Sequence, residues 1–348
     1  MNLTHALKAT ERSLIWTAMR ARVRVGAALW PQRTAEAVAQ RFFRTERPAP
    51  ARLDFSVSPR IGRMVVPDGT ITTYRWDAAA AAGRSAPLVL LVHGWNGWAQ
   101  QLEAFVAPLQ ARGFAVLAFD HVAHGRSDGV QTSLPAMMRS LESLLAQEPA
   151  VRAAVAHSLG AAATAAVLAS AERQLDAAVL VAPPSDPRPY LRALALALAA
   201  PHSLLPAIQR AAERHAGVAF EHLVADPLRV RRIRTPLLIV HDVTDNDVPI
   251  TEGHAYAAAA QARLLVSDGL GHRRVLRDAH VVQESVDFVA GRRERGVAGA
   301  KDGAAIAGDG PATAVADAVI GSTAPRAVLP RQSAALQSAA ADASCCAR

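Results

Sequence analysis

Residues 153–165 of the chain read AAVAHSLGAAATA. The first residues of this stretch have the apolar character of a short buried strand, and the alanine-rich run after Gly160 continues as a helix. Ser158 therefore stands at a sharp turn from a strand into a helix, with small residues, Ala156 and Gly160, two positions to either side. Such a turn exposes a serine Oγ and points the following backbone N–H at a developing oxyanion. The stretch predicts a nucleophilic serine on a fold that alternates strands and helices.

A second window, Gly125–Gly129, is the literal match to the G-x-S-x-G pattern. Its context differs, because it begins six residues beyond an apolar run that ends at Phe119, and no helical pattern follows before Pro135. We therefore interpret it as a glycine-rich loop over the carboxyl edge of a sheet, with Ser127 outside the chemistry. The competing interpretation of Ser158 is an ordinary serine N-cap of a helix.

Working outward from Ser158, short apolar runs alternate with longer helical stretches, the pattern typical of a mostly parallel sheet covered by helices. We predict an α/β fold with a twisted sheet of about eight strands and helices on both faces. Two of these strands flank a hairpin turn at Pro67–Gly69. The predicted strands are Arg63–Val66, Ile71–Tyr74, Leu88–Val92, Phe114–Phe119, Arg152–Ala156, Ala177–Val181, Pro236–Val240 and Arg263–Val266, followed by a helix over Asp278–Ala290.

Composition divides the chain into three segments. Residues 1–57 predict a helical arm rich in arginine, broken at prolines, and residues 58–296 predict the α/β domain. Within that domain, residues 183–228 interrupt the alternation with a proline-rich turn and Leu/Ala-rich helices, which favours a small helical lid. Residues 297–348 are rich in Ala and Gly without periodicity, so we predict a disordered tail.

The strand predicted at Leu88–Val92 ends in His93-Gly94-Trp95. Glycine at position 94 allows the backbone to approach a substrate closely. The N–H of Trp95, together with that of Leu159 after the serine, would supply the two donors that an oxyanion needs. His93 is interpreted as a packed, hydrogen-bonded residue that supports this loop.

A serine nucleophile needs a base, and the base needs a carboxylate that fixes its tautomer. Three aspartates follow the strand predicted at Pro236–Val240. Asp245 is favoured because it lies a few residues into the loop, where its side chain can turn back over the sheet edge, and Asp242 and Asp247 remain rivals. His272, in a glycine-punctuated loop after the last predicted strand, is the favoured base.

Other histidines fit the chemistry less well. His254 and His280 fall in helical stretches, which favours surface or packing roles. The spacing of Asp120, His121 and His124 would allow a metal site, but nothing else in the sequence supports one. We therefore predict no metal and no cofactor.

Charge is concentrated at one end of the chain. Residues 1–63 carry twelve Lys/Arg against four Asp/Glu, whereas the remainder is balanced. We expect this arm to pack on its own domain; the alternative is a helix that lies on an anionic membrane surface through residues 1–50. No aromatic-interleaved basic motif occurs, so nucleic acid is not expected as a partner.

The positions of the cysteines and the charges near the N-terminus indicate a cellular compartment. The only cysteines, Cys345 and Cys346, are adjacent, which rules out a disulfide framework. Charged residues interrupt the first thirty positions and leave no secretory signal, and no apolar run reaches the length of a membrane span. A cytoplasmic protein, with the membrane surface as the alternative site, is the expectation.

Taken together, these motifs resemble the α/β-hydrolase superfamily in its serine esterase, lipase-like and serine aminopeptidase branch. The resemblance covers residues 60–292 and rests on His93-Gly94-Trp95, the 120–127 loop, Ala156–Gly160, His241–Pro249 and Gly271-His272. It implies that Ser158, Asp245 and His272 form a catalytic triad. Ala156 departs from the glycine that is usual there.

The resemblance also implies a function. We expect cleavage of a carboxylic ester with an apolar acyl group through an acyl-enzyme, and a small-molecule acyl substrate as the partner. The alternatives are a thioesterase, an amidase or peptidase, or a protein without turnover that binds membranes through its basic arm.

Overall fold

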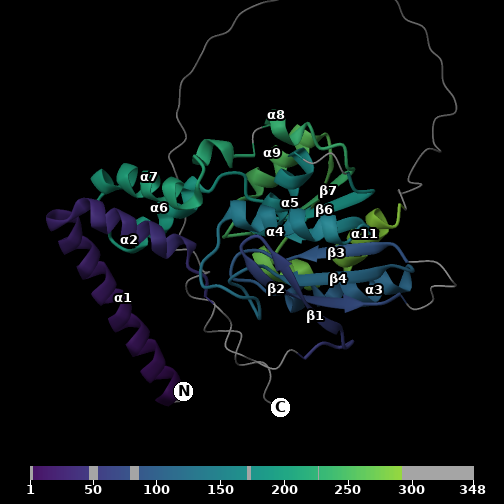
Figure 1. The fold of residues 1–348 in the computed structure, drawn as a ribbon, viewed down its shortest axis with the longest axis horizontal. Helices are drawn as coiled ribbons and strands as arrows, with labels where there is room; N and C mark the ends of the chain where they lie inside the picture. The colour runs from purple at the N-terminus through teal and green to yellow at the C-terminus, as the bar shows by residue number, and fades with distance from the viewer. Residues whose placement is uncertain (1–2, 47–53, 79–85, 171–173, 226, 292–348) are drawn as a thin grey trace, which may run out of the picture. The chain divides into compact units, whose positions relative to one another are not determined.

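One mixed sheet forms the centre of the protein in the computed structural model, which describes residues 3–46, 54–78, 86–170, 174–225 and 227–291 (Figure 1). The sheet has eight strands within these ranges, in the order β1-β2-β4-β3-β5-β6-β7-β8. The β1–β2 and β2–β4 pairs are antiparallel, and all later pairs are parallel. The strands are β1 (Arg60–Val66), β2 (Gly69–Trp76), β3 (Leu88–Val92), β4 (Ala115–Asp120), β5 (Val151–His157), β6 (Ala177–Val181), β7 (Leu237–Asp242) and β8 (Arg263–Ser267).

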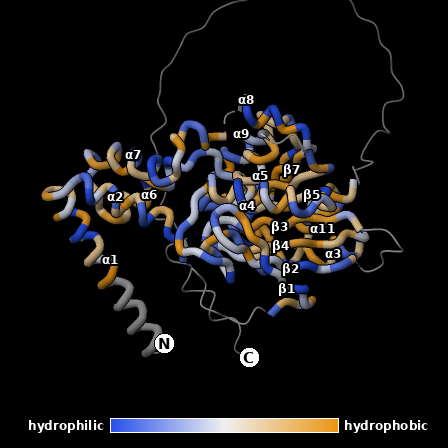
Figure 2. Tube along the Cα trace, in the orientation of Figure 1, coloured by the Kyte–Doolittle hydropathy of each residue, from blue (hydrophilic) through white to orange (hydrophobic). Residues whose placement is uncertain are grey.

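The central strands are apolar on both faces because helices cover both. In β3, Leu88, Leu90 and Val92 face one layer, whereas Val89 and Leu91 face the other. Figure 2 shows these strands as the most hydrophobic part of the trace. The first layer holds α4 (Leu134–Gln147), α5 (Leu159–Ser170), α8 (Pro227–Val230) and α9 (Ile250–Ala260), and the second holds η1 (Ala99–Phe105), α3 (Val106–Ala111), η4 (Val275–Arg277) and α11 (Ala279–Val289).

The predicted fold class is confirmed. The strands expected at Leu88–Val92 and Ala177–Val181 match β3 and β6, and the others differ by a few residues at their ends. The hairpin strands β1 and β2 are longer than predicted, because their ladder continues past the apolar positions to Arg60 and Arg75.

The N-terminal helices and the lid helices share a separate apolar cluster. Here α1 (Leu3–Leu29) and α2 (Pro31–Phe43) pack with α6 (Arg188–Ala197), η2 (His202–Leu204), α7 (Leu205–Ala216) and η3 (Phe220–His222) (Figure 1). Phe43 of α2 stacks on His215 of α7 with ring centroids 4.6 Å apart, and Arg214 forms an ion pair with Glu36. The apolar side chains of the lid helices and of the arm therefore form one shared core.

Two hydrogen bonds connect the end of the arm to loops at the carboxyl edge of the sheet. Thr45 donates from Oγ1 to the carbonyl of Ala123 at 2.5 Å, and the N–H of Glu46 donates to Asn96 Oδ1 at 2.8 Å. The helical part of the arm ends at Phe43, and Phe55 packs on the sheet residue Tyr74.

The predicted tail, residues 297–348, lies outside the described residues. Of the helices in the described ranges, none combines the length and apolarity needed to span a bilayer.

Candidate active site

Ser158 occupies the turn between β5 and α5. Its backbone φ is +53°, an unusual value for a residue with a side chain, and its N–H donates to the carbonyl of Val181 at 2.8 Å. A Cβ at Gly160 would lie 2.2 Å from the carbonyl oxygen of His93, so only glycine allows α5 to approach β3 this closely. Ala156 is fully buried in the core, where its methyl group is accommodated.

Three predicted site residues from separate loops are in hydrogen-bond contact. Ser158 Oγ lies 2.9 Å from His272 Nε2, and His272 Nδ1 lies 2.7 Å from Asp245 Oδ2. A carboxylate accepts, so Nδ1 carries the proton and Nε2 is left to accept from the serine hydroxyl. The side chain of Asp245 is 1% exposed and that of His272 is 11% exposed. This arrangement can transfer a proton from Ser158 to an oriented imidazole.

Backbone donors hold Asp245 in place. Its Oδ1 accepts from the N–H groups of Asp247 and Val248, each at 2.8 Å, which leaves Oδ2 directed at the histidine. Asp247 therefore contributes a backbone N–H to this loop.

Asp242 has a role that the sequence did not indicate. Its carboxylate accepts from the N–H groups of Leu270 at 3.0 Å and Gly271 at 2.8 Å, and from the hydroxyls of Thr244 and Ser267. Burial alone would raise the pKa of Asp242, but these hydrogen bonds together hold it well below its usual value. Asp242 thus fixes the loop that presents His272.

His157 is a second residue that the sequence did not indicate. Its Nε2–H donates to the carbonyl oxygen of His272 at 2.9 Å, and the two rings lie 4.6 Å apart. Burial, followed by the neighbouring His272, lowers the pKa of His157 well below its ordinary value, so the ring is neutral. The sequence shows a histidine next to the predicted nucleophile, but the residue to which it bonds, His272, is 115 positions further along the chain.

The loop after β3 meets the serine through Gly94. A Cβ there would lie 2.7 Å from Ser158 Cβ, so glycine is required for this approach. Trp95 follows in the same loop, and Leu159 begins α5. In the described part of the chain, neither of their N–H groups donates to another protein group. The amino end of α5 adds positive potential beside Ser158.

A group of histidines supports this loop from below. His93 is fully buried, donates from Nδ1 to the carbonyl of Gly94 at 2.7 Å, and accepts at Nε2 from the N–H of His121 at 2.9 Å. Asn96, with φ +54°, donates its N–H to His124 Nε2 at 3.0 Å. His93 therefore links the Gly94 loop to the loop that begins at His121.

Ser127 of the literal motif is buried away from His272. Its Oγ donates to the carbonyl of Asp120 at 2.5 Å and accepts from the N–H of Thr72 at 2.8 Å. Asp120 in turn accepts from the hydroxyl of Tyr74 at 2.8 Å, and burial raises its pKa. Within the described ranges, no three His, Cys, Asp or Glu side chains are arranged to hold a metal ion. His254 and His280 are exposed on α9 and α11.

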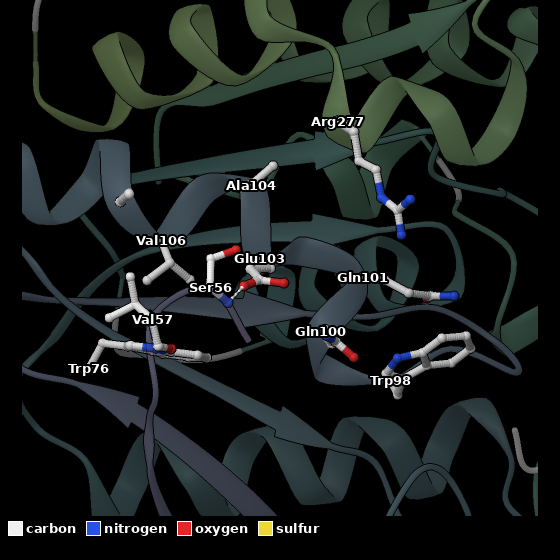
Figure 3. A pocket seen from close by; sticks show the side chains of 11 residues that line it. Ser56, Val57, Trp76, Trp98, Gln100, Gln101, Glu103, Ala104, Val106 and Arg277 are labelled. Carbon is white, nitrogen blue, oxygen red and sulfur yellow. Dashed lines mark hydrogen bonds between the residues drawn. The ribbon is translucent and has the colours of Figure 1, made fainter. Parts of the chain in front are cut away.

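A pocket of about 470 Å³ opens elsewhere, beside η1 and α3 (Figure 3). Figure 3 shows Trp76 on one side and Arg277 on the other, with Glu103 bonded to the backbone of Ser56 between them. None of the predicted site residues lines this pocket. The contacts of Ser158, and not the size of a cavity, therefore define the candidate active site.

Comparisons with known proteins relate the chain to hydrolases. A family model described as serine aminopeptidase, S33, matches residues 83–250, a span that includes Ser158 and Asp245 and ends before His272. No curated protein matches the chain. An esterase of Pyrococcus furiosus is 19% identical, with a TM-score of 0.52 over 72% of this chain and 96% of that one.

A second solved structure is Est1E from Butyrivibrio proteoclasticus with ferulic acid bound. It is 19% identical, with a TM-score of 0.51 over 66% of this chain and 98% of that one. At 19% identity the two solved structures show the fold alone, whereas the family model shows a sequence match over residues 83–250. With its mostly parallel sheet and its sharp turn at Ser158, the chain has the α/β-hydrolase fold.

Proposed function

We propose that the chain is a serine hydrolase with Ser158 as nucleophile, His272 as general base and Asp245 as the orienting carboxylate. The observation that carries the proposal is the continuous contact from Ser158 Oγ to His272 at 2.9 Å and from His272 to Asp245 at 2.7 Å. The imidazole of His272 accepts the serine proton in this position, while the buried carboxylate stabilises the imidazolium that forms.

The reaction has two steps. Ser158 Oγ attacks a substrate carbonyl and its proton passes to His272 Nε2, while the N–H groups of Trp95 and Leu159 stabilise the oxyanion. His272 then gives the proton to the leaving group and an acyl-enzyme remains. A water molecule, deprotonated by His272, attacks the acyl carbon and releases the acid and free Ser158. No cofactor takes part in these steps.

The substrate we propose is a carboxylic ester with an apolar acyl group. Leu159, the residue after Ser158, packs together with the half-buried side chains of Met138 and Leu223 on one small apolar cluster. They come from α5, α4 and the end of the lid, so apolar surface from three elements meets at the residue that follows the nucleophile. An apolar acyl group gains by removing this surface from water.

The family model favours a second candidate, cleavage of a peptide or amide bond, because its description is that of a serine aminopeptidase. A matched pair of substrates with the same acyl group, one an aryl ester and one an anilide, separates the two. Turnover of the ester alone supports the esterase, and comparable kcat/KM on aminoacyl anilides supports the peptidase.

Labelling with a fluorophosphonate probe tests the proposal, because such probes react with an activated serine. Ser158→Ala should abolish labelling and hydrolysis, while Ser127→Ala should keep the labelling even though it loses two buried hydrogen bonds. Thermal unfolding of both variants identifies any loss that comes from misfolding. Labelling that persists in Ser158→Ala would overturn the assignment.

A further inference from the structure

The helix α1 has two different apolar faces. On its inner face, Trp16, Met19, Val23 and Ala27 are half-buried and pack on the cluster shared with the lid helices. These positions follow helical spacing, so they account for how the helix is attached to the protein. They do not account for the apolar residues on its other side.

The outer face carries an exposed apolar stripe, which we define as Leu14, Ala18, Ala21, Val25 and Leu29. The spacing of four, three, four and four residues aligns these side chains along one side of a helix. Leu14, Val25 and Leu29 are each more than half exposed. Figure 2 shows apolar and polar positions mixed along the described part of α1. A continuous row of this kind marks an interaction surface, unlike apolar residues scattered singly.

Positive charge flanks the stripe. At 100° per residue, Arg22 and Arg24 lie on opposite sides of it, and both are exposed. Between residues 14 and 46 the acidic residues are Glu36 and Glu46, which form ion pairs with Arg214 and Arg41. Both carboxylates between residues 14 and 46 therefore pair with arginines other than Arg22 and Arg24.

We propose that α1 binds the surface of an anionic lipid bilayer, with the stripe inserted at the boundary between headgroups and acyl chains. Arg22 and Arg24 would then lie at the level of the lipid phosphates, the arrangement of an interfacial amphipathic helix. Trp30, more than half exposed at the end of α1, is a residue type enriched at that level. A second copy of α1 fits less well, because pairing two stripes would bring the like charges of Arg22 and Arg24 of both copies close together.

Sedimentation of the full chain with vesicles tests this surface. Vesicles of phosphatidylcholine with phosphatidylserine should bind the chain, vesicles of phosphatidylcholine alone should bind it weakly, and high salt should release it. Replacing both arginines, Arg22→Ser with Arg24→Ser, should weaken binding to anionic vesicles by about 30-fold, given the usual contribution of each arginine near such a surface. The matched control is Arg231→Ser with Arg232→Ser, two exposed arginines of the body.

The stripe has its own pair of variants. Val25→Glu should weaken binding, whereas Val65→Glu, at an exposed valine of β1, should not. Each variant should hydrolyse a small ester in solution at the parent rate, which separates membrane binding from the proposed chemistry. Absence of binding by the parent chain, or equal binding by the Val25→Glu variant, would overturn the proposal. A concentration-dependent dimer that Val25→Glu dissociates would assign the stripe to a second copy instead.

Discussion

His157 donates a hydrogen bond from Nε2 to the backbone carbonyl of His272, at 2.9 Å. The residue that precedes the proposed nucleophile therefore fixes the backbone of the proposed base. Because both ends of this contact are part of the proposed reaction centre, the distance between Ser158 Oγ and His272 Nε2 depends on it. His157 is a positioning residue in this account, since its ring does not reach the serine hydroxyl.

Replacing His157 by phenylalanine keeps the ring packed on His272 but removes the donor. We expect kcat for a small ester to fall by about tenfold, the usual contribution of one neutral hydrogen bond. KM should change little, because the substrate is not contacted. His157→Gln retains a donor at a similar distance and should recover part of kcat. Equal kcat for the two variants would show that packing, and not the hydrogen bond, is what matters.

Asp245→Asn should lose mainly activity, whereas Asp242→Asn should lose mainly stability. Asparagine at 245 leaves the loop in place but lets His272 take the wrong tautomer, so kcat should fall by roughly three to four orders of magnitude with little change in Tm. Asparagine at 242 places an amide N–H₂ against the donors of Leu270, Gly271 or Ser267. This substitution should lower the free energy of unfolding by about 2 kcal/mol. It should lower kcat less than Asp245→Asn does.

The pH dependence of stability separates these two aspartates further. The pKa of Asp242 is lowered in the folded state, so its contribution is present above the unfolded pKa of about 3.9 and is lost as pH falls through the folded value. The stability difference between parent and Asp242→Asn should therefore shrink below about pH 4. Urea unfolding at several pH values measures it, and a difference that stays constant into acid would contradict the hydrogen-bond network.

The placement of the proposed site was predictable for a topological reason. Parallel strands end at the same edge of a sheet, so residues shortly after β3, β5, β7 and β8 had to converge there. The roles of His157 and Asp242 were not predictable, because each depends on contacts with the His272 loop that no local pattern encodes. The same holds for the apolar face of α2, which the sequence leaves open and the lid helices cover.

The acyl group should be selected by the apolar side chains that cluster with Leu159. Leu223→Asp puts a charge at the half-buried end of the lid, in the cluster with Leu159. Values of kcat/KM for long-chain p-nitrophenyl esters should fall by more than tenfold, and those for the acetate ester should stay within about threefold, because acetate is too short to gain from this surface. Leu228→Asp, at an exposed leucine nearby in sequence, is the control. A uniform loss across chain lengths would place the acyl group elsewhere.

His121 should make the fold sensitive to acid. It is fully buried, and neither ring nitrogen has a hydrogen-bond partner among the described residues. Burial lowers its pKa well below the ordinary value, and the neighbouring His93 and His124 lower it further, while burial also brings the pKa of His93 down to about 4. His121 and His93 are therefore neutral in the folded protein.

The sign of the effect follows from where protons bind. The unfolded chain takes up a proton at His121 and at His93 below pH about 6.5, whereas the folded chain does not, so stability must fall as pH drops below that value. His121→Leu removes one such site without breaking a hydrogen bond. The free energy of unfolding of His121→Leu should therefore equal that of the parent at pH 7.5. Between about pH 6 and 4.5 it should fall by about 1.4 kcal/mol less per pH unit than that of the parent. Urea unfolding across this range measures both slopes, with exposed His254→Leu as the control expected to follow the parent. Parallel curves for parent and His121→Leu would mean that His121 is protonated in the folded state, and the neutral packing of the histidines beneath the Gly94 loop would have to be abandoned.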